Sequence, residues 1–438
     1  MFETLKNAFK VKEIRRKIFI TLFLLLVYRF GCWLPIPGIS GDYYNSNIDN
    51  GMSDSIVGLM SALSGGALAN GAFLALGVVP YINASIIVQL LGVAIPALER
   101  LSKQGEEGRR KLNQYTRYLT LILALAQSIG VVVGMVNSGH ISEQLFGAGT
   151  SLEWLIATFV VIIMTAGVSF TMWLGEKITE LNIGNGISLL IFVGILSTAA
   201  QSIQATVVQI FEGNNSAIWY LVAFFALILV IFLFIVFIDS SERRIAIQYA
   251  KQIKGRKMYG GQATHIPIKV NALGVMPIIF AMAIVTFPQI IFQLFAPNSG
   301  AYRWYMENLG AGTWPYALIT GILVLLFSFF YAKIQFNPED VSRNIQQYGG
   351  FIPGIRPGKP TTEYLAKINN RLTLMGAIFL AFIAIVPSVI FAIIFGAQAQ
   401  LINAFSATGM LIVVSIALEI DKQLQGQLMM KHYKGFLQ

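Results

Sequence analysis

Residues 64–91, SGGALANGAFLALGVVPYINASIIVQLL, form an apolar run of membrane-spanning length that contains residues unsuited to a lipid-facing helix. Glycines interrupt its first half, Pro80 lies in its middle, and Asn83 and Gln89 place amides in the apolar part. An unpaired amide costs about 2–7 kcal/mol in hydrocarbon. Such residues are tolerated where they are buried in protein or line a watery cavity. The stretch therefore either faces a path through the bilayer or forms a polar helix–helix contact, and composition leaves both open.

The whole chain has the composition of an integral membrane protein. Of its 438 residues, 55% are hydrophobic and 12% are charged, and the charges cluster between apolar runs. A spanning helix needs about 20 mainly apolar residues. The sequence contains ten such segments, centred near residues 26, 83, 127, 164, 194, 228, 283, 323, 383 and 409. We expect an all-α polytopic membrane protein of ten transmembrane helices.

Basic residues indicate the orientation of these spans. All but two of the 31 Lys and Arg residues lie before span 1, after the even-numbered spans or in the tail; the exceptions are Arg29 and Arg303. By the positive-inside rule, both termini and the even-numbered loops are cytoplasmic. Two of these loops, about residues 239–270 and 333–371, keep their basic residues away from the membrane. We expect them to bind an acidic lipid surface, a nucleic-acid backbone such as ribosomal RNA, or an acidic protein surface.

Segments outside the spans give weaker signals. Residues 1–17 are expected to form a cytoplasmic interfacial segment, and residues 419–438 a cytoplasmic tail. The apolar patch at residues 56–63 is too short to span; it is either a re-entrant half-helix or an ordinary outer loop, and composition favours the loop. The GNG sequence at residues 184–186 is expected to be a flexible start to span 5.

Span 7 shares the irregular composition of span 2. It carries Asn271, Gly274, Pro277 and Pro288. Spans 2 and 7 occupy corresponding places in two halves of five spans, residues 18–210 and 211–418. Interrupted helices at matched positions indicate two pseudo-symmetric inverted halves with a pathway between them.

The sequence lacks the usual signatures of catalysis. No acidic, basic or His side chain lies at the midplane of a span, and neither HExxH nor a P-loop is present. Cys32, the only cysteine, is expected to act as a small apolar residue. We predict no enzyme, no catalytic residue, no cofactor and no metal site. Three classes stay open: a passive channel gated by branched apolar residues and driven by a partner, an inverted-repeat secondary transporter of a small solute, and an assembly scaffold without a pore.

Five sequence blocks, in order and over essentially the whole length, resemble the SecY family of protein-conducting channel subunits. They are residues 64–91, 105–118 (GEEGRRKLNQYTRY), 173–192 (WLGEKITELNIGNGISLLIF), 243–281 and 336–361. The resemblance implies a channel of the bacterial plasma membrane that passes unfolded secretory polypeptides and releases transmembrane helices laterally into lipid. The implied partners are the SecE and SecG subunits, the SecA motor, the ribosome, a preprotein with its signal sequence, and membrane lipid.

The resemblance also implies roles for individual residues. A pore ring would consist of Val78, Ile82, Ile187, Ile191, Ile279 and Ile412. A plug would cover about residues 54–66, which reverses the preference for a plain loop, and would include Ile56, Val57, Leu59, Met60, Leu63, Gly65 and Gly66. A lateral gate between spans 2 and 7 would carry Asn83, Gln89 and Asn271. A docking surface for SecA or the ribosome would carry Arg109, Arg110, Arg243, Arg244 and Arg356.

Overall fold

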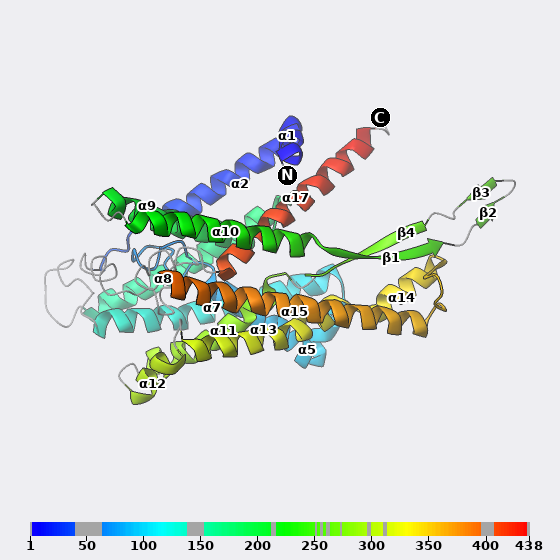
Figure 1. Cartoon of the computed structure of the whole chain (residues 1–438). Coiled ribbons are helices and arrows are strands. Elements are labelled where there is room, and N and C mark those ends of the chain that lie inside the picture. The colour runs from blue at the N-terminus through cyan, green and yellow to red at the C-terminus, as the bar shows by residue number, and fades with distance from the viewer. Residues whose placement is uncertain are drawn as a thin grey trace. The chain divides into compact units, whose positions relative to one another are not determined.

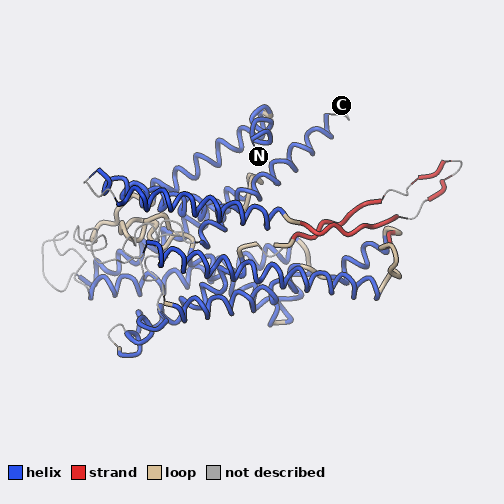
Figure 2. The backbone as a smooth tube through the Cα atoms, in the orientation of Figure 1, coloured by secondary structure: helices blue, strands red, loops and turns tan. Residues whose placement is uncertain are grey.

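Long helices dominate the computed structural model of the chain (Figures 1 and 2). It describes residues 2–39, 64–137, 153–211, 216–249, 252–254, 257–259, 263–271, 274–295, 299–309, 313–395 and 407–435. Each of the ten predicted span centres lies inside a helix. These helices are α2 (Lys12–Gly31), α5 (Val79–Ala94), α7 (Glu106–Asn137), α8 (Glu153–Glu180), α9 (Gly186–Phe211), α10 (Ser216–Ser240), α11 (Met276–Phe295), α13 (Trp314–Gln335), α15 (Lys359–Phe395) and α17 (Ala407–Gly435). The shorter helices are α1 (Phe2–Lys10), α6 (Pro96–Lys103), α12 (Gly300–Leu309) and α14 (Pro338–Gln347).

Six helical segments in the described part of the chain are long and apolar enough to cross a membrane. They are Glu106–Val136, Trp154–Glu180, Gly186–Phe211, Leu221–Ser240, Trp314–Gln347 and Lys359–Val386. Two shorter apolar segments, Val79–Ala94 and the first part of α11, Met276–Val285, belong to the spans that the sequence predicts to be interrupted. On α10 large apolar side chains such as Leu233 and Phe237 are exposed, which suits a helix that faces lipid.

The chain forms two compact units. The first comprises Met1–Phe224, Ala283–Tyr316 and Phe391–Gln438, and the second comprises Phe225–Met282 and Ala317–Ile390. The two inverted halves, residues 18–210 and 211–418, stay a prediction.

The core of the first unit lies between α7, α8 and residues 64–78. Its buried side chains are Ile36, Ile39, Leu68, Ala75, Leu76, Ala124, Val132, Met135, Ile156, Ala157, Val160, Met164 and Val168. Polar contacts also join α7 to α8: the hydroxyls of Ser128 and Thr165 lie 3.1 Å apart, and the guanidinium of Arg117 donates to both carboxylate oxygens of Glu176 at 2.7 and 2.8 Å. Tight packing and a few paired polar groups therefore hold these helices together.

In the second unit, α10, α11, α13 and α15 pack through aromatic side chains. The ring of Phe280 on α11 lies edge-on to Phe327 and Tyr331 of α13, with centroids 5.7 and 6.0 Å apart. The ring of Phe234 on α10 meets Phe379 of α15 at 5.6 Å. Edge-to-face pairs at these distances add to the stabilisation from buried area.

The long loop after α10 forms β-strands, which the sequence analysis did not predict. β1 (Glu242–Tyr249) pairs antiparallel with β4 (Ala263–Lys269), and β5 (Gly350–Phe351) pairs with the other edge of β1. β2 (Gln252–Lys254) and β3 (Lys257–Tyr259) continue the hairpin at its far end (Figure 2). On β1, Ile245 and Ile247 are buried while their neighbours are exposed, the alternation expected of a strand with one covered face.

We call β1, β4, β5, α14, residues 352–358 and the start of α15 the strand module. A small core stabilises it and takes residues from both long basic loops. The buried members are Ile245, Ile247, Ile268, Ile345, Ile352 and Leu365. The two loops, far apart in sequence, thus form one structural element.

Candidate functional site

The stretch that the sequence presents as one span has two parts in the structure. Residues 64–78, here called the central segment, form irregular turns, and helix α5 begins only at Val79. The backbone of the central segment pairs with residues 34–36: the Ile36 N–H donates to the Gly71 carbonyl at 3.0 Å, and the Phe73 N–H donates to the Leu34 carbonyl at 2.8 Å. Most of its residues are buried. Protein therefore covers the irregular backbone, as membrane depth requires.

Two glycines at the start of the central segment are required by both conformation and space. Gly65 has φ of +71° and Gly66 has φ of +85°, the region that favours glycine. A Cβ on Gly65 would lie 2.6 Å from Nη1 of Arg29 and 3.0 Å from the Cα of Gly194. A Cβ on Gly66 would lie 3.0 Å from Oε1 of Gln201. The segment thus passes closely between α2 and α9.

Side chains at and just after the end of α2 bond to the start of the central segment. Arg29 donates from Nη1 to the Gly65 carbonyl at 2.7 Å, and its guanidinium carbon lies 5.3 Å from the centroid of the Trp33 ring. The thiol of Cys32 donates to the Ser64 carbonyl at 3.6 Å. The sequence analysis noted Arg29 and Cys32 but assigned neither to a site. The available signal was the charge itself, because an ionised side chain inside a span requires a partner.

The predicted ring residues divide between the two units. Val78, Ile82, Ile187, Ile191 and Ile412 belong to the first unit, and Ile279 to the second. Val78, Ile191 and Ile412 are buried, whereas Ile82, Ile187 and Ile279 are half-buried. Helix α9, which carries Ile187 and Ile191, packs against α17, which carries Ile412. A ring closed by residues of both units stays a prediction.

The start of α9, where a flexible turn was expected, makes hydrogen bonds to its own cap and to α8. Asn185 caps the helix, with its side-chain oxygen accepting from the Ile187 N–H at 3.1 Å. The Gly186 N–H donates to the Thr179 hydroxyl at 2.8 Å, and a Cβ on Gly186 would lie only 1.9 Å from the Gly175 carbonyl oxygen. The polar turn residues thus bond to the helix that they begin and to α8, and the expected flexibility stays a prediction.

The predicted gate amides have different environments. Asn83 is half-buried on α5, and exposed Gln89 donates to the Ser85 hydroxyl at 3.3 Å. Asn271 precedes α11 in the second unit, is 3% exposed, and donates to the Asp239 carboxylate at 2.9 Å. The sequence analysis missed Asp239, a buried carboxylate near the end of α10. A gate formed by all three amides stays a prediction.

Most of the predicted plug lies outside the described residues. This part includes Ile56, Val57, Leu59, Met60 and Leu63, so the structure describes only Gly65 and Gly66 among the assigned plug residues. Within the described ranges, no group of three or more His, Cys, Asp or Glu side chains is arranged to hold a metal ion.

All five predicted docking arginines are exposed. Arg109 and Arg110 lie in the first turns of α7, where Arg110 pairs with Glu106 at 2.8 Å. Exposed i,i+4 ion pairs of this kind add little stability. The other three arginines belong to the strand module: Arg243 and Arg244 lie on β1, and Arg356 follows β5. The module thus presents basic residues from both long loops.

Both chain ends meet in the first unit. Helix α1 packs on α17, and the buried side chains between these helices, the start of α2 and the α8–α9 turn are Ala8, Ile14, Ile183, Leu424 and Leu428. Gln425 donates to the Thr4 hydroxyl at 3.5 Å, and Gln427 donates to the Asn182 carbonyl. Residues 1–17 therefore include a packed helix.

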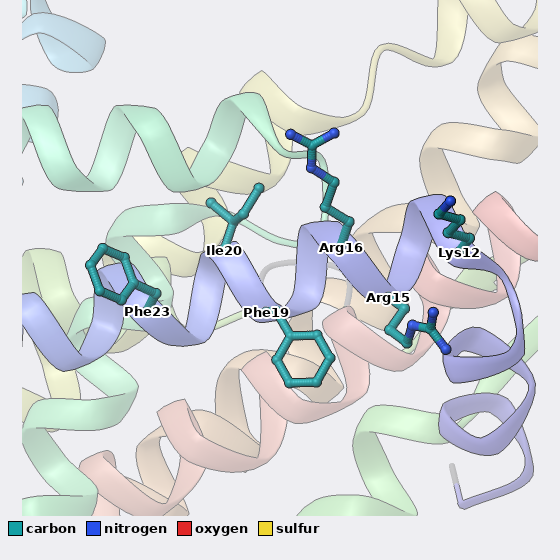
Figure 3. A pocket seen from close by; sticks show the side chains of 6 residues that line it. All are labelled: Lys12, Arg15, Arg16, Phe19, Ile20 and Phe23. Atoms are coloured by element: carbon teal, nitrogen blue, oxygen red, sulfur yellow. The ribbon is translucent and has the colours of Figure 1, made fainter.

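Helix α2 carries an amphipathic hollow on its exposed side. Its volume is about 440 Å³, and it is lined by Lys12, Arg15, Arg16, Phe19, Ile20 and Phe23 (Figure 3). The spacing of three and four residues places all six on one helix face. The basic residues lie toward the N-terminus and the apolar ones follow, which is the order suited to a membrane surface.

The chain is similar over most of its length to one family of known proteins. The family model SecY matches residues 72–420. The chain is 41% identical over 446 residues to the protein translocase subunit SecY of Streptomyces galbus, with 100% of each chain covered. It is 40% identical over 450 residues to that of Corynebacterium glutamicum, covering 98% of this chain and 99% of the relative.

Solved structures share the fold at lower identity. The protein in "The structure of a protein conducting channel" aligns with a TM-score of 0.62 at 21% identity, covering 92% of this chain and 90% of its own. Sec61 in a canine ribosome–channel complex aligns with a TM-score of 0.58 at 19% identity, with the same coverage. These structures confirm the predicted helical polytopic fold, and the sequence relatives supply the family. The chain belongs to the SecY family of protein translocase subunits.

Proposed function

We propose that the chain forms the path by which unfolded polypeptide crosses the bacterial plasma membrane, and that branched apolar side chains seal this path at rest. The observation that carries the proposal is the irregular central segment, packed against α9, the helix that holds Ile187 and Ile191. A narrow ring of such side chains gates by dewetting. The assigned ring is Val78, Ile82, Ile187, Ile191, Ile279 and Ile412.

A stalled substrate tests the path directly. A photo-crosslinking residue at position 187 should react with a secretory precursor, bearing its signal sequence, that has been stopped in mid-transport. The matched control is the same probe at Leu233, which is 59% exposed on α10. Equal crosslinking at both positions would contradict the proposal.

Ion conductance tests the seal. Ile82→Gly and Ile191→Gly each remove a branched side chain from the ring, so they should raise the conductance of the resting channel in a planar bilayer. Leu196→Gly on the same helix as Ile191 is the control, because Leu196 is exposed. Unchanged conductance in either ring variant would show that the replaced residue is not part of the seal.

We also assign residues 54–66 as a plug, and Asn83, Gln89 and Asn271 as the polar side of a lateral gate. One solved relative is described as having a plug domain that stabilises the closed state of its channel. For the gate, a crosslink between Asn83→Cys and Asn271→Cys in a Cys32→Ser background should block release of apolar helices into lipid, and reduction should restore it. Continued release through the crosslinked protein would rule out this gate.

The exposed arginines of α7 and the strand module are the proposed docking surface for SecA or the ribosome. Relatives of the same fold occur in ribosome complexes from dog and yeast, and a basic surface suits both ribosomal RNA and acidic protein. Arg356→Glu should lower motor-driven transport of a precursor, while Arg303→Glu, on the opposite predicted side, should not. SecE and SecG are the proposed subunits of the same complex.

Membrane lipid is the proposed partner of α2. Each basic residue near an anionic lipid surface contributes about 1 kcal/mol to the free energy of binding to that surface. The hollow combines three such residues, Lys12, Arg15 and Arg16, with an apolar end. Both termini are proposed to be cytoplasmic. Arg15→Glu together with Arg16→Glu should weaken retention of anionic lipid by the purified protein; unchanged retention would exclude this face.

A further inference from the structure

We propose that Arg29 is a positioning residue that holds the C-terminal end of the plug, residues 64–66, in the resting channel. The hydrogen bond from its guanidinium to the Gly65 carbonyl, 2.7 Å long, is the contact that does so. The inference rests on the proposed function, in which residues 54–66 form the plug.

The position of Gly65 makes this contact close and directional. Gly65 is buried, and its backbone lies against both Arg29 and Gly194 of α9. A guanidinium is always charged and donates along fixed directions. A charged donor strengthens a hydrogen bond, and the buried carbonyl would lose its partner if Arg29 were removed. The bond therefore opposes withdrawal of residues 64–66 from α2.

Arg29 also has a contact that does not depend on the plug. Its guanidinium lies over the ring of Trp33, one helical turn further along the chain. A cation over an aromatic face is stabilised electrostatically. Release of Gly65 would therefore leave Arg29 with the Trp33 ring as a nearby partner, so the hydrogen bond can break and form again. We call this hydrogen bond the latch.

The resting conductance of the complete translocase in a planar bilayer, without precursor, measures the latch. Arg29→Leu should raise it about tenfold, the size of change expected for loss of one charged hydrogen bond. Arg29→Lys keeps the charge but loses the planar fork, so it should give a smaller rise; it is the decisive variant if Arg29→Leu does not assemble. Wild-type conductance in Arg29→Lys and Arg29→Leu would overturn the proposal.

Two controls distinguish a latch from a general role of Arg29 in stability. Ile14→Ala removes a buried side chain of α2, far along the helix from Arg29. This variant should have a lower melting temperature and an unchanged conductance. If Arg29 had a purely structural role, Arg29→Leu would show the same two results. Deletion of residues 54–63 tests the plug itself. If the deletion raises conductance and Arg29→Leu does not, the latch is wrong and the plug stands; if the deletion has no effect, the proposed plug is wrong.

Discussion

At the scale of single residues, glycines determine how closely the helices of the first unit approach. Gly186→Ala would place a methyl group 1.9 Å from the Gly175 carbonyl oxygen, so α8 and α9 would have to separate. Overpacking of this kind costs about 1–3 kcal/mol. We expect a lower melting temperature of the purified protein.

Gly92→Ala is the matched control for that change. Nothing lies within 4 Å of a Cβ added to Gly92 on α5, and replacing a helical glycine by alanine removes backbone freedom from the unfolded chain. The control should melt at the wild-type temperature or above it. Equal destabilisation by both variants would show that space at Gly186 is not the cause.

Sequence analysis could find unusual residues but could not pair them. Arg29 and Cys32 stood out by type, yet their partners, the carbonyls of Gly65 and Ser64, are backbone groups 36 and 32 residues away. Asn271 was assigned to a gate, while its bond to Asp239 was not expected. Residue type indicates that a partner is needed; only the fold identifies it.

At the scale of one element, the start of α9 determines where Ile187 lies. Asn185→Ala removes the cap, which costs about 1 kcal/mol, and should loosen the first turn and raise resting conductance. Asn185→Asp retains an oxygen that can accept the Ile187 N–H, so it should behave as wild type in the same bilayer measurement. A leak in both variants would point to the amide nitrogen instead of the cap.

The strand module depends on a core of its own. Ile247→Ala deletes a fully buried side chain from β1, which costs about 2–5 kcal/mol in a packed core. Limited proteolysis should then cut the β1–β4 region faster, and precursor transport should fall with it. Ala246→Ser, at an exposed neighbouring position, should change neither rate; faster cleavage there would mean that the hairpin is not protected by its core.

Helices and strands differed in how well the sequence revealed them. Apolar runs of spanning length correctly located a helix at each of the ten predicted span centres, because length and hydropathy alone give that signal. The alternation of Ile245 and Ile247 on β1 was also present, but β5, which pairs with one edge of β1, lies far along the chain. Basic composition therefore suggested a loop, and long-range pairing decided the outcome.

At the scale of the whole molecule, composition and motif order together identified the fold and the family. Family membership also decides among the three function classes: a protein translocase subunit belongs to a protein-conducting channel, and is neither a small-solute transporter nor a scaffold without a pore. The interruption of span 2 could be recognised from its glycine, proline and amide content, whereas α11 in span 7 runs from Met276 to Phe295 with Pro288 inside it. The backbone path of span 2 could not be predicted, because it depends on the packing of the central segment against α2 and α9.

Orientation in the membrane follows from the distribution of basic residues over the entire chain, and one labelling experiment checks it. Since Cys32 is the only cysteine, a Cys32→Ser background carries no thiol, and Lys359→Cys and Arg303→Cys each introduce one at an exposed position. The positive-inside rule puts position 359 in the cytoplasm and position 303 outside. A membrane-impermeant maleimide should therefore label position 303 in cells whose plasma membrane is intact and accessible, and position 359 only in inverted vesicles. The opposite pattern would reverse the topology and move the strand module away from SecA and the ribosome.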